Sequence, residues 1–135
     1  MFNIYVLDDT REHRDMLRII LEDVYGAGVK VETFSCADDL ISRIRMGERP
    51  DLIFTDYRMP GKDGLNVAKE LRGFNGSQML YDGPMILLTA DMITAEQAAS
   101  AGINRVIRKP YELDDIVNAV VLEYELAEGL HKNGE

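Results

Sequence analysis

The residues of this sequence that could carry chemistry stand where short apolar segments end. They are acids after the first and third segments, a hydroxyl residue at the end of the fourth and a lysine after the fifth: Asp8, Asp9, Asp56, Thr89 with Ala90, and Lys109 with Pro110. An ionised carboxylate can accept a phosphoryl group without a general base. A metal ion, an ammonium group and a hydroxyl around it would supply the charge neutralisation that phosphoryl transfer requires.

The aspartates predict a Mg²⁺ site if the fold brings Asp8, Asp9 and Asp56 into one cleft. Neighbouring carboxylates raise one another's pKa and resist joint ionisation, so such a cluster is costly without a cation. Mg²⁺ prefers oxygen ligands and usually takes one or two carboxylates together with waters and phosphate oxygens. Lys109 would add a fixed positive charge, and Asp56 is the natural nucleophile.

Five apolar segments of strand length alternate with five segments of helical periodicity. The expected strands are Phe2–Leu7, Val29–Phe34, Asp51–Thr55, Pro84–Thr89 and Asn104–Arg108, and the expected helices are Thr10–Tyr25, Ala37–Gly47, Gly64–Phe74, Ile93–Ala101 and Glu112–Leu126. This alternation predicts an α/β domain with a doubly wound, five-stranded parallel sheet and helices on both faces. In the strand order 2-1-3-4-5, the first and third strands are neighbours where the winding reverses, which is where such sheets bind ligands.

The chain of 135 residues predicts one domain, residues 1–127, followed by a polar tail, residues 128–135. Gly73–Gly83 is the least regular internal stretch and predicts a flexible loop in which Met79, Leu80 and Tyr81 can pack. Cys36 is the single cysteine, so no internal disulfide is possible, which favours a cytoplasmic location. A net charge of −9 works against direct nucleic-acid binding, and no apolar stretch is long enough for membrane insertion.

Taken together, these motifs resemble the receiver domains of two-component response regulators over about residues 2–126. The matching features, in chain order, are Asp8-Asp9, Asp56, Met59-Pro60, Asp63-Gly64, Thr89-Ala90 and Lys109-Pro110. Each is weak alone, but their appearance at successive predicted strand ends makes the set specific. The resemblance implies a flavodoxin-like fold of order 2-1-3-4-5. It also implies Mg²⁺-dependent transfer of a phosphoryl group from a partner's phosphohistidine to Asp56.

The resemblance implies a role for each metal-site position. Asp56 would be the phosphoacceptor and, with Asp9, a direct Mg²⁺ ligand. Asp8 would hold the metal mainly through water, and the backbone carbonyl of Arg58 would complete the set. Such a domain is not an enzyme in the usual sense, because it catalyses only its own phosphorylation and dephosphorylation.

The resemblance also assigns the groups that contact the phosphoryl oxygens. Thr89 would donate its hydroxyl, Ala90 its backbone N–H, and Lys109 would pair with the phosphate. A cis bond would precede Pro110. Arg58 and Asp91 would flank the cleft and modulate the access of water.

The implied phosphoryl donor is a histidine kinase or a histidine phosphotransfer protein. It would dock beside the cleft at Arg11, His13, Met16 and Pro110. The sequence does not identify the output partner. It leaves open whether phosphorylation causes the domain to dimerise, and whether the domain stands alone or belongs to a hybrid kinase or larger regulator.

Val106 departs from the family pattern, because this position usually carries an aromatic residue that moves with the threonine. Output would then pass through Thr89, the loop into the fourth helix, or Tyr111. Val106 also supports an alternative, a pseudo-receiver that binds partners without control by phosphate. A second alternative is a phosphohydrolase similar to the haloacid dehalogenases. The adjacent Asp8-Asp9 pair breaks the spacing of that family, and 135 residues leave no room for a cap domain.

Overall fold

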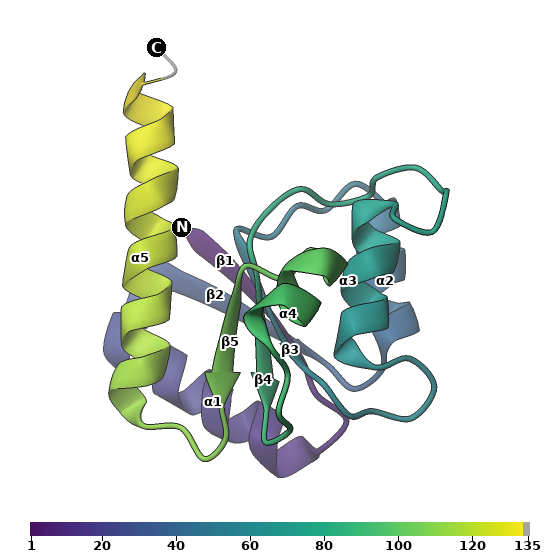
Figure 1. Ribbon diagram of the computed structural model, residues 1–135. Coiled ribbons are helices and arrows are strands. Elements are labelled where there is room, and N and C mark those ends of the chain that lie inside the picture. Colours follow the sequence, from purple (N-terminus) through teal and green to yellow (C-terminus); the bar gives the residue numbers. More distant parts are fainter. Residues whose placement is uncertain (134–135) are drawn as a thin grey trace.

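Five parallel strands form one sheet in the order β2-β1-β3-β4-β5, which confirms the predicted topology (Figure 1). The computed structural model describes the backbone of residues 1–133 and the side chains of residues 1–126. The elements are β1 Phe2–Leu7, α1 Arg11–Tyr25, the 3₁₀ turn η1 Gly26–Gly28, β2 Val29–Phe34, α2 Ala37–Arg45, β3 Leu52–Asp56, α3 Gly64–Arg72, β4 Met85–Thr89, α4 Ala95–Ala101, β5 Arg105–Arg108 and α5 Leu113–Asn133.

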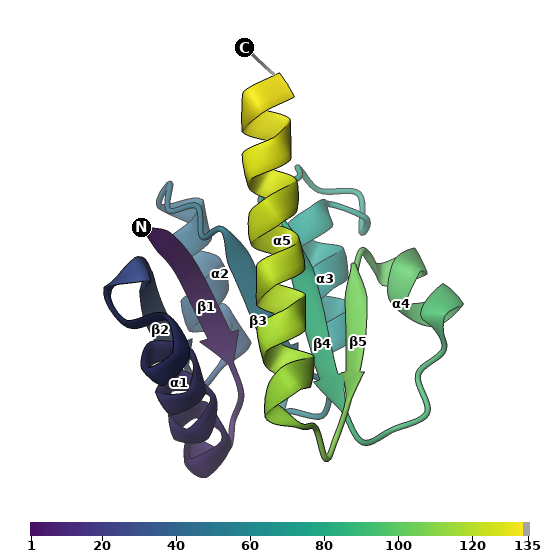
Figure 2. The same cartoon turned by 90° about the vertical axis from the view of Figure 1, so that its left-hand side faces the viewer.

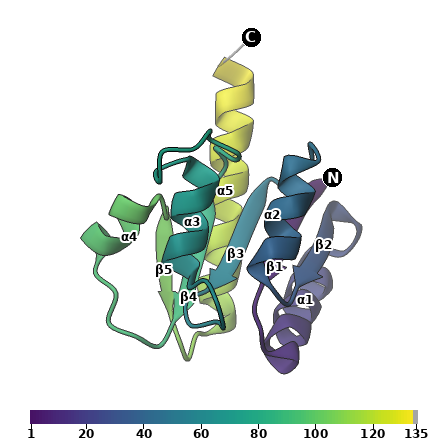
Figure 3. The ribbon, with the colours of Figure 1, turned by 90° about the vertical axis from the view of Figure 1, so that its right-hand side faces the viewer.

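Helices cover both faces of the sheet, with α1 and α5 on one face and α2, α3 and α4 on the other (Figures 2 and 3). Successive residues of a strand point to opposite faces. Ile4 and Val6 of β1 therefore belong to the core under α1 and α5, whereas Tyr5 and Leu7 belong to the core under α2, α3 and α4. Both faces must be apolar, which explains the nearly continuous aliphatic segments in the sequence.

The register of the strands aligns their carboxyl ends at one edge. Leu7 pairs with Thr55 across β1 and β3, and Asp56 pairs with Leu88 across β3 and β4. Thr89 in turn pairs with Arg108 across β4 and β5. Polar residues that follow these strands in the sequence are thereby collected at one edge of the sheet.

Several helix boundaries differ from the predicted ones for local reasons. α4 begins at Ala95 rather than Ile93, because Thr94 caps it in a capping box with Gln97. α3 ends at Arg72 because Gly73 adopts a left-handed conformation, with φ of 75°. α5 continues through residue 133, since a glycine within a helix costs only about 1 kcal/mol and does not by itself end it. Residues 134 and 135 of the predicted tail lie outside the described part of the chain.

The stretch Gly73–Gly83 was predicted to be a flexible loop, but its second half is held in place by hydrogen bonds and packing. The backbone N–H groups of Leu80 and Tyr81 both donate to the carbonyl of Leu71, at 2.8 and 3.0 Å. Tyr81 is buried, and its hydroxyl donates to the carbonyl of Pro50 at 3.0 Å. The local packing expected for Leu80 and Tyr81 is therefore present.

A network of charged side chains lies towards the edge of the sheet opposite to Asp8, Asp9 and Asp56. The hydroxyl of Tyr5 donates to Glu48, and Arg43 donates two hydrogen bonds to the same carboxylate, at 2.7 and 2.9 Å. These hydrogen bonds, with that from Arg43 the strongest cause, lower the pKa of Glu48 to about 2. A carboxylate with a lowered pKa stabilises the native state above its ordinary pKa and loses that effect as the pH falls.

We expect Glu48→Gln to lower the free energy of unfolding at pH 7, and this loss to vanish as the pH falls from about 4.5 towards 2. Urea unfolding of both proteins at several pH values measures the difference. Glu22→Gln is the matched control, because Glu22 is exposed on α1 and makes no ion pair within the described residues. A difference between wild type and Glu48→Gln that stays constant with pH would contradict this account.

Candidate functional site

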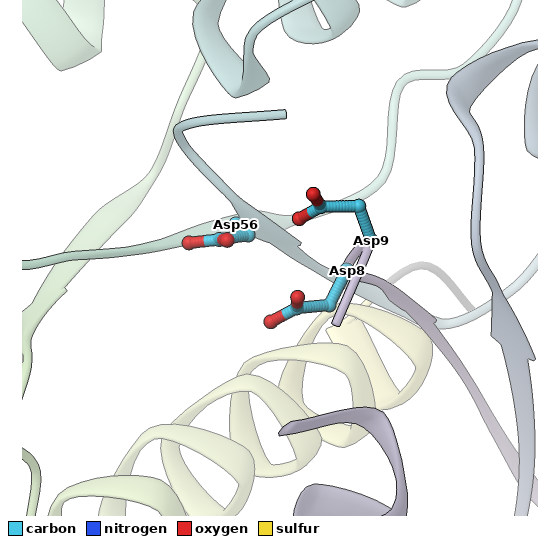
Figure 4. A group of neighbouring side chains, drawn as sticks. All are labelled: Asp8, Asp9 and Asp56. Carbon is cyan, nitrogen blue, oxygen red and sulfur yellow. The ribbon is translucent and has the colours of Figure 1, made fainter. Parts of the chain in front are cut away.

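The three predicted aspartates meet at the carboxyl edge of the sheet (Figure 4). Asp8 and Asp9 follow β1, and Asp56 is the last residue of the neighbouring strand β3. One carboxylate oxygen from each residue lies within 4.8 Å of those of the other two. The sequence prediction of a shared cleft is therefore realised in the fold.

The cluster carries an electrostatic cost of the kind that a bound cation relieves. Asp8 is 4 % exposed and Asp56 is 9 % exposed, whereas Asp9 is open to solvent. Burial raises the pKa of Asp8, and the charge of Asp56 raises it further, against the lowering effect of the Thr10 N–H, which donates to Asp8 at 2.9 Å. An all-oxygen donor set with one open side suits a hard cation such as Mg²⁺.

Lys109 brings a positive charge to the buried pair of acids. Its Nζ lies 3.0 Å from Oδ1 of Asp56 and 3.8 Å from Oδ2 of Asp8. The peptide bond between Lys109 and Pro110 is cis, as expected from the sequence. One ammonium group balances only part of the charge of three carboxylates, which leaves the cleft negative.

The two oxygens of the Asp56 carboxylate have different surroundings. Oδ1 accepts a hydrogen bond from Lys109 and another from the backbone N–H of Tyr57, both at 3.0 Å. Oδ2 receives no hydrogen bond from the described residues. The second oxygen is thus the one available for new bonds.

Thr89 and Arg58 lie beside the acceptor but are engaged elsewhere. Thr89 is buried at the end of β4, and its Oγ1 accepts the backbone N–H of Asp91 at 2.9 Å. The guanidinium of Arg58 makes two hydrogen bonds to the Asp91 carboxylate, at 2.7 and 3.0 Å. Ala90 is exposed between these groups. The sequence placed Arg58 and Asp91 at the cleft but did not predict that they pair.

The sequence identified Gly64 only as part of the Asp63-Gly64 motif, and the structure shows why this position must be a glycine. It is the first residue of α3, and its N–H donates to the carbonyl of Tyr57 at 2.8 Å. A Cβ atom there would overlap the backbone oxygen of Asp56 and lie 2.7 Å from Cδ1 of Leu87. Gly64 follows Asp63, which caps α3. This position in the sequence does not reveal that the helix approaches the backbone of β3 so closely.

A pocket of about 490 Å³ opens beside the acids, between α1 and the segment after β5. It is lined by Asp8, His13, Met16, Leu17, Leu88, Ala90, Lys109, Pro110 and Tyr111. Three of the four positions expected at a docking surface line it, whereas Arg11 is exposed elsewhere on α1 and pairs with Asp15.

Tyr111 is half-buried, and burial raises its pKa. Val106 packs against the core on the α3 and α4 side.

We expect Asp8→Asn to raise the free energy of unfolding at pH 7 without divalent cations, by roughly 0.5–2 kcal/mol, the usual size of a stabilising charge substitution. The raised pKa of Asp8 means that the native state binds its proton more tightly than the unfolded chain does, so the carboxylate costs native stability at neutral pH. Urea unfolding with a chelator measures this, and added Mg²⁺ should stabilise the wild type more than the variant. A less stable variant in the chelator would contradict the expected sign.

Comparisons with known proteins agree with this geometry. A family model described as "Response regulator receiver domain" matches residues 4–121. The chain is 38 % identical over 110 residues to the cyclic di-GMP phosphodiesterase response regulator RpfG of Xanthomonas campestris pv. campestris. It is 31 % identical over 119 residues to the DNA-binding transcriptional regulator NtrC of Salmonella typhimurium.

These two alignments cover 80 % and 87 % of the chain, but only 28 % and 24 % of RpfG and NtrC. The chain therefore spans about a quarter of the length of these curated relatives. Among solved structures, the response regulator TrrA of Thermotoga maritima in complex with Mg(2+)-BeF matches with a TM-score of 0.74 and 27 % identity. That match covers 91 % of this chain and 99 % of TrrA. Within the described residues, no helix is both long and apolar enough to cross a membrane.

Proposed function

This chain belongs to the response regulator receiver domain family, and on that premise we propose that it is a phosphoacceptor switch whose acceptor is Asp56. The observation that carries the proposal is the buried Asp56 carboxylate, which lies among Asp8, Asp9 and Lys109 with one oxygen free of hydrogen bonds from the described residues. Receiver domains are regulatory. We accordingly propose that this chain catalyses only its own phosphorylation and dephosphorylation.

The transfer forms one bond and breaks one bond. Oδ2 of Asp56 would attack the phosphorus of a partner's phosphohistidine, and the N–P bond would break with its electron pair returning to the imidazole. Oδ1 remains held by Lys109 and the Tyr57 N–H, which fixes the orientation of the carboxylate. Lys109 would also neutralise charge on the phosphoryl oxygens.

The residues that fit Mg²⁺ are Asp9 and Asp56 as direct ligands, Asp8 through water, and the backbone carbonyl of Arg58, which lies in the loop after β3. When bound, Mg²⁺ would supply positive charge to the phosphoryl oxygens at the acceptor. The Thr89 hydroxyl and the Ala90 N–H, at the end of β4 and just after it, would bind the remaining phosphoryl oxygens.

The proposed donor is a histidine kinase or a histidine phosphotransfer protein in the cytoplasm. Its phosphohistidine would enter beside the pocket formed by α1 and the segment after β5, where His13, Met16 and Pro110 lie next to Lys109. RpfG is named as a phosphodiesterase response regulator, and NtrC as a DNA-binding transcriptional regulator. This chain matches only about a quarter of each protein, so these activities are not assigned to it.

A pseudo-receiver is the weaker, second candidate. Val106 keeps it open, whereas the complete set of acids, Thr89 and Lys109 supports the phosphoacceptor. The valine offers no ring that could follow Thr89 inward, so a partner could read the scaffold without reading phosphate. Partner binding that is indifferent to Asp56→Asn would support this candidate.

Intact-mass spectrometry after incubation with Mg²⁺ and a small acyl phosphate tests the proposed function. We expect one added phosphoryl group per chain, and none when a chelator removes the metal. If Mg²⁺ binds but no adduct forms under any condition, the phosphoacceptor proposal is wrong and the pseudo-receiver stands.

A further inference from the structure

The turn between β1 and α1 carries two of the three clustered acids, Asp8 and Asp9. The backbone N–H of Asp8 donates to the carbonyl of Phe34 at 3.1 Å, which fastens the start of the turn to β2. Oδ1 of Asp8 accepts the backbone N–H of Thr10 at 2.9 Å, a contact by which an aspartate side chain closes a turn. Neither hydrogen bond involves the main-chain carbonyl of Asp8.

That carbonyl accepts a hydrogen bond from Arg14, in the first turn of α1. Nη1 of Arg14 lies 2.7 Å from the carbonyl oxygen of Asp8. Arg14 is partly buried and makes no ion pair within the described residues, although the neighbouring turn carries two aspartates. Guanidinium groups bind carboxylates more strongly than neutral acceptors. The contact that this arginine makes therefore fixes the backbone of the turn and leaves the acids unpaired.

Asp9 depends on the backbone of the turn more than the other two acids do. The carboxylates of Asp8 and Asp56 both accept hydrogen bonds that hold them. The carboxylate of Asp9 is exposed and accepts no hydrogen bond from the described residues. One of its oxygens nevertheless lies within 4.8 Å of those of the other two acids (Figure 4). Its position is therefore set through its main chain, and Arg14 holds the peptide group that precedes it.

The charge of Arg14 acts on a bound cation in the opposite direction to its hydrogen bond. The guanidinium lies against the turn that carries Asp8 and Asp9, so its positive charge repels a cation at these acids. If charge alone mattered, removal of the guanidinium would tighten the binding of Mg²⁺. If the hydrogen bond matters more, removal would weaken binding, because groups that orient metal ligands typically contribute about 10- to 100-fold to metal affinity.

We propose that Arg14 is a positioning residue for the Mg²⁺ site. Through the carbonyl of Asp8, it holds the turn in the conformation that brings the Asp9 carboxylate to the cluster. This inference rests on the proposed function, because that function places Mg²⁺ at the aspartates. The hydrogen bonds that hold the Asp56 carboxylate come from Lys109 and the Tyr57 N–H, so the acceptor itself does not depend on Arg14.

Mg²⁺ titrations followed by the backbone amide NMR signals of residues 8–10 and 56–58 test the proposal. Arg14→Met should raise the Kd for Mg²⁺ by about three- to tenfold, which is the range of one lost hydrogen bond. Arg14→Lys keeps the charge and a donor group, so its Kd should lie between those of the wild type and Arg14→Met. At saturating Mg²⁺, Arg14→Met should form the phosphoryl adduct at about the wild-type rate.

Arg18→Met is the matched control. Arg18 lies one turn further along α1, is also partly buried, and donates to the Thr33 hydroxyl at 3.1 Å instead of to the turn. Its substitution removes the same charge, and the Kd for Mg²⁺ should stay within about twofold of the wild type.

A Kd for Arg14→Met equal to or below that of the wild type would overturn the proposal. An equal rise in Arg18→Met would also overturn it, because the loss would then follow the charge rather than the contact with the turn. These results would leave the proposed function intact. If the wild type itself binds no Mg²⁺ at residues 8–10 and 56–58, the metal site of the proposed function is wrong, and the role of Arg14 is refuted with it.

Discussion

Asp56→Asn is expected to abolish the phosphoryl adduct that the wild type forms with Mg²⁺ and a small acyl phosphate. The amide has nearly the shape of the carboxylate and can still accept the Tyr57 N–H through its oxygen. It lacks the anionic oxygen that would attack phosphorus. Asp8, the other acid beside Lys109, lies further from its Nζ, at 3.8 Å against 3.0 Å for Asp56. Intact-mass spectrometry of both proteins under identical conditions gives the comparison.

The control for this experiment is an acid that lies far from the cleft. Asp82→Asn changes the net charge by the same amount, and Asp82 is exposed in the loop before β4. This variant should form the adduct to the same extent as the wild type. An adduct that persists in Asp56→Asn would show that another residue is the acceptor, and peptide mapping would locate it.

The acid cluster could be predicted because it depends on topology alone. In a parallel sheet of order 2-1-3-4-5, residues that follow the first and third strands must lie close together, whatever their side-chain conformations. Asp8, Asp9 and Asp56 needed only the strand order. The βα alternation predicted a doubly wound parallel sheet, and the resemblance to receiver domains implied the order. The position of Lys109 at the same edge followed for the same reason.

The pairing of Arg58 with Asp91 could not be predicted, because it depends on the conformations of the loop after β3 and the loop before α4. Arg72 was also missed, for a different reason. An arginine in the last turn of a helix ordinarily faces water, and its partners here are mainly main-chain carbonyls of residues 9 and 30 positions away. No side-chain pattern marks such acceptors. The sequence therefore predicts the positions of the site residues better than it predicts the side-chain contacts that hold the surrounding loops and helices.

Gly64→Ala is expected to destabilise the fold by about 1–3 kcal/mol or more, the usual cost of inserting a methyl group where there is no space. The added Cβ would meet the backbone oxygen of Asp56 and the side chain of Leu87. Neither can yield cheaply, because both belong to central strands that are buried along their whole length. Urea unfolding measures the loss.

Gly28→Ala provides the matched control, because a Cβ atom at Gly28 would have no atom within 4 Å. Its free energy of unfolding should stay within about 0.5 kcal/mol of the wild type. Equal stability of the two variants would mean that α3 does not approach β3 as closely as the structure shows.

Gly64→Ala should also affect the rate of phosphoryl transfer to Asp56, separately from its effect on the stability of the fold. To relieve the contact, α3 must move away from β3. Because the Gly64 N–H donates to the carbonyl of Tyr57, and the Tyr57 N–H donates to the Asp56 carboxylate, this movement displaces the carboxylate as well. A displacement of about 1 Å can slow a positioned reaction by about a hundredfold. We therefore expect Gly64→Ala to form the phosphoryl adduct more slowly even at temperatures where it is fully folded. Gly28→Ala, which lies at the opposite end of the sheet, should react at the wild-type rate.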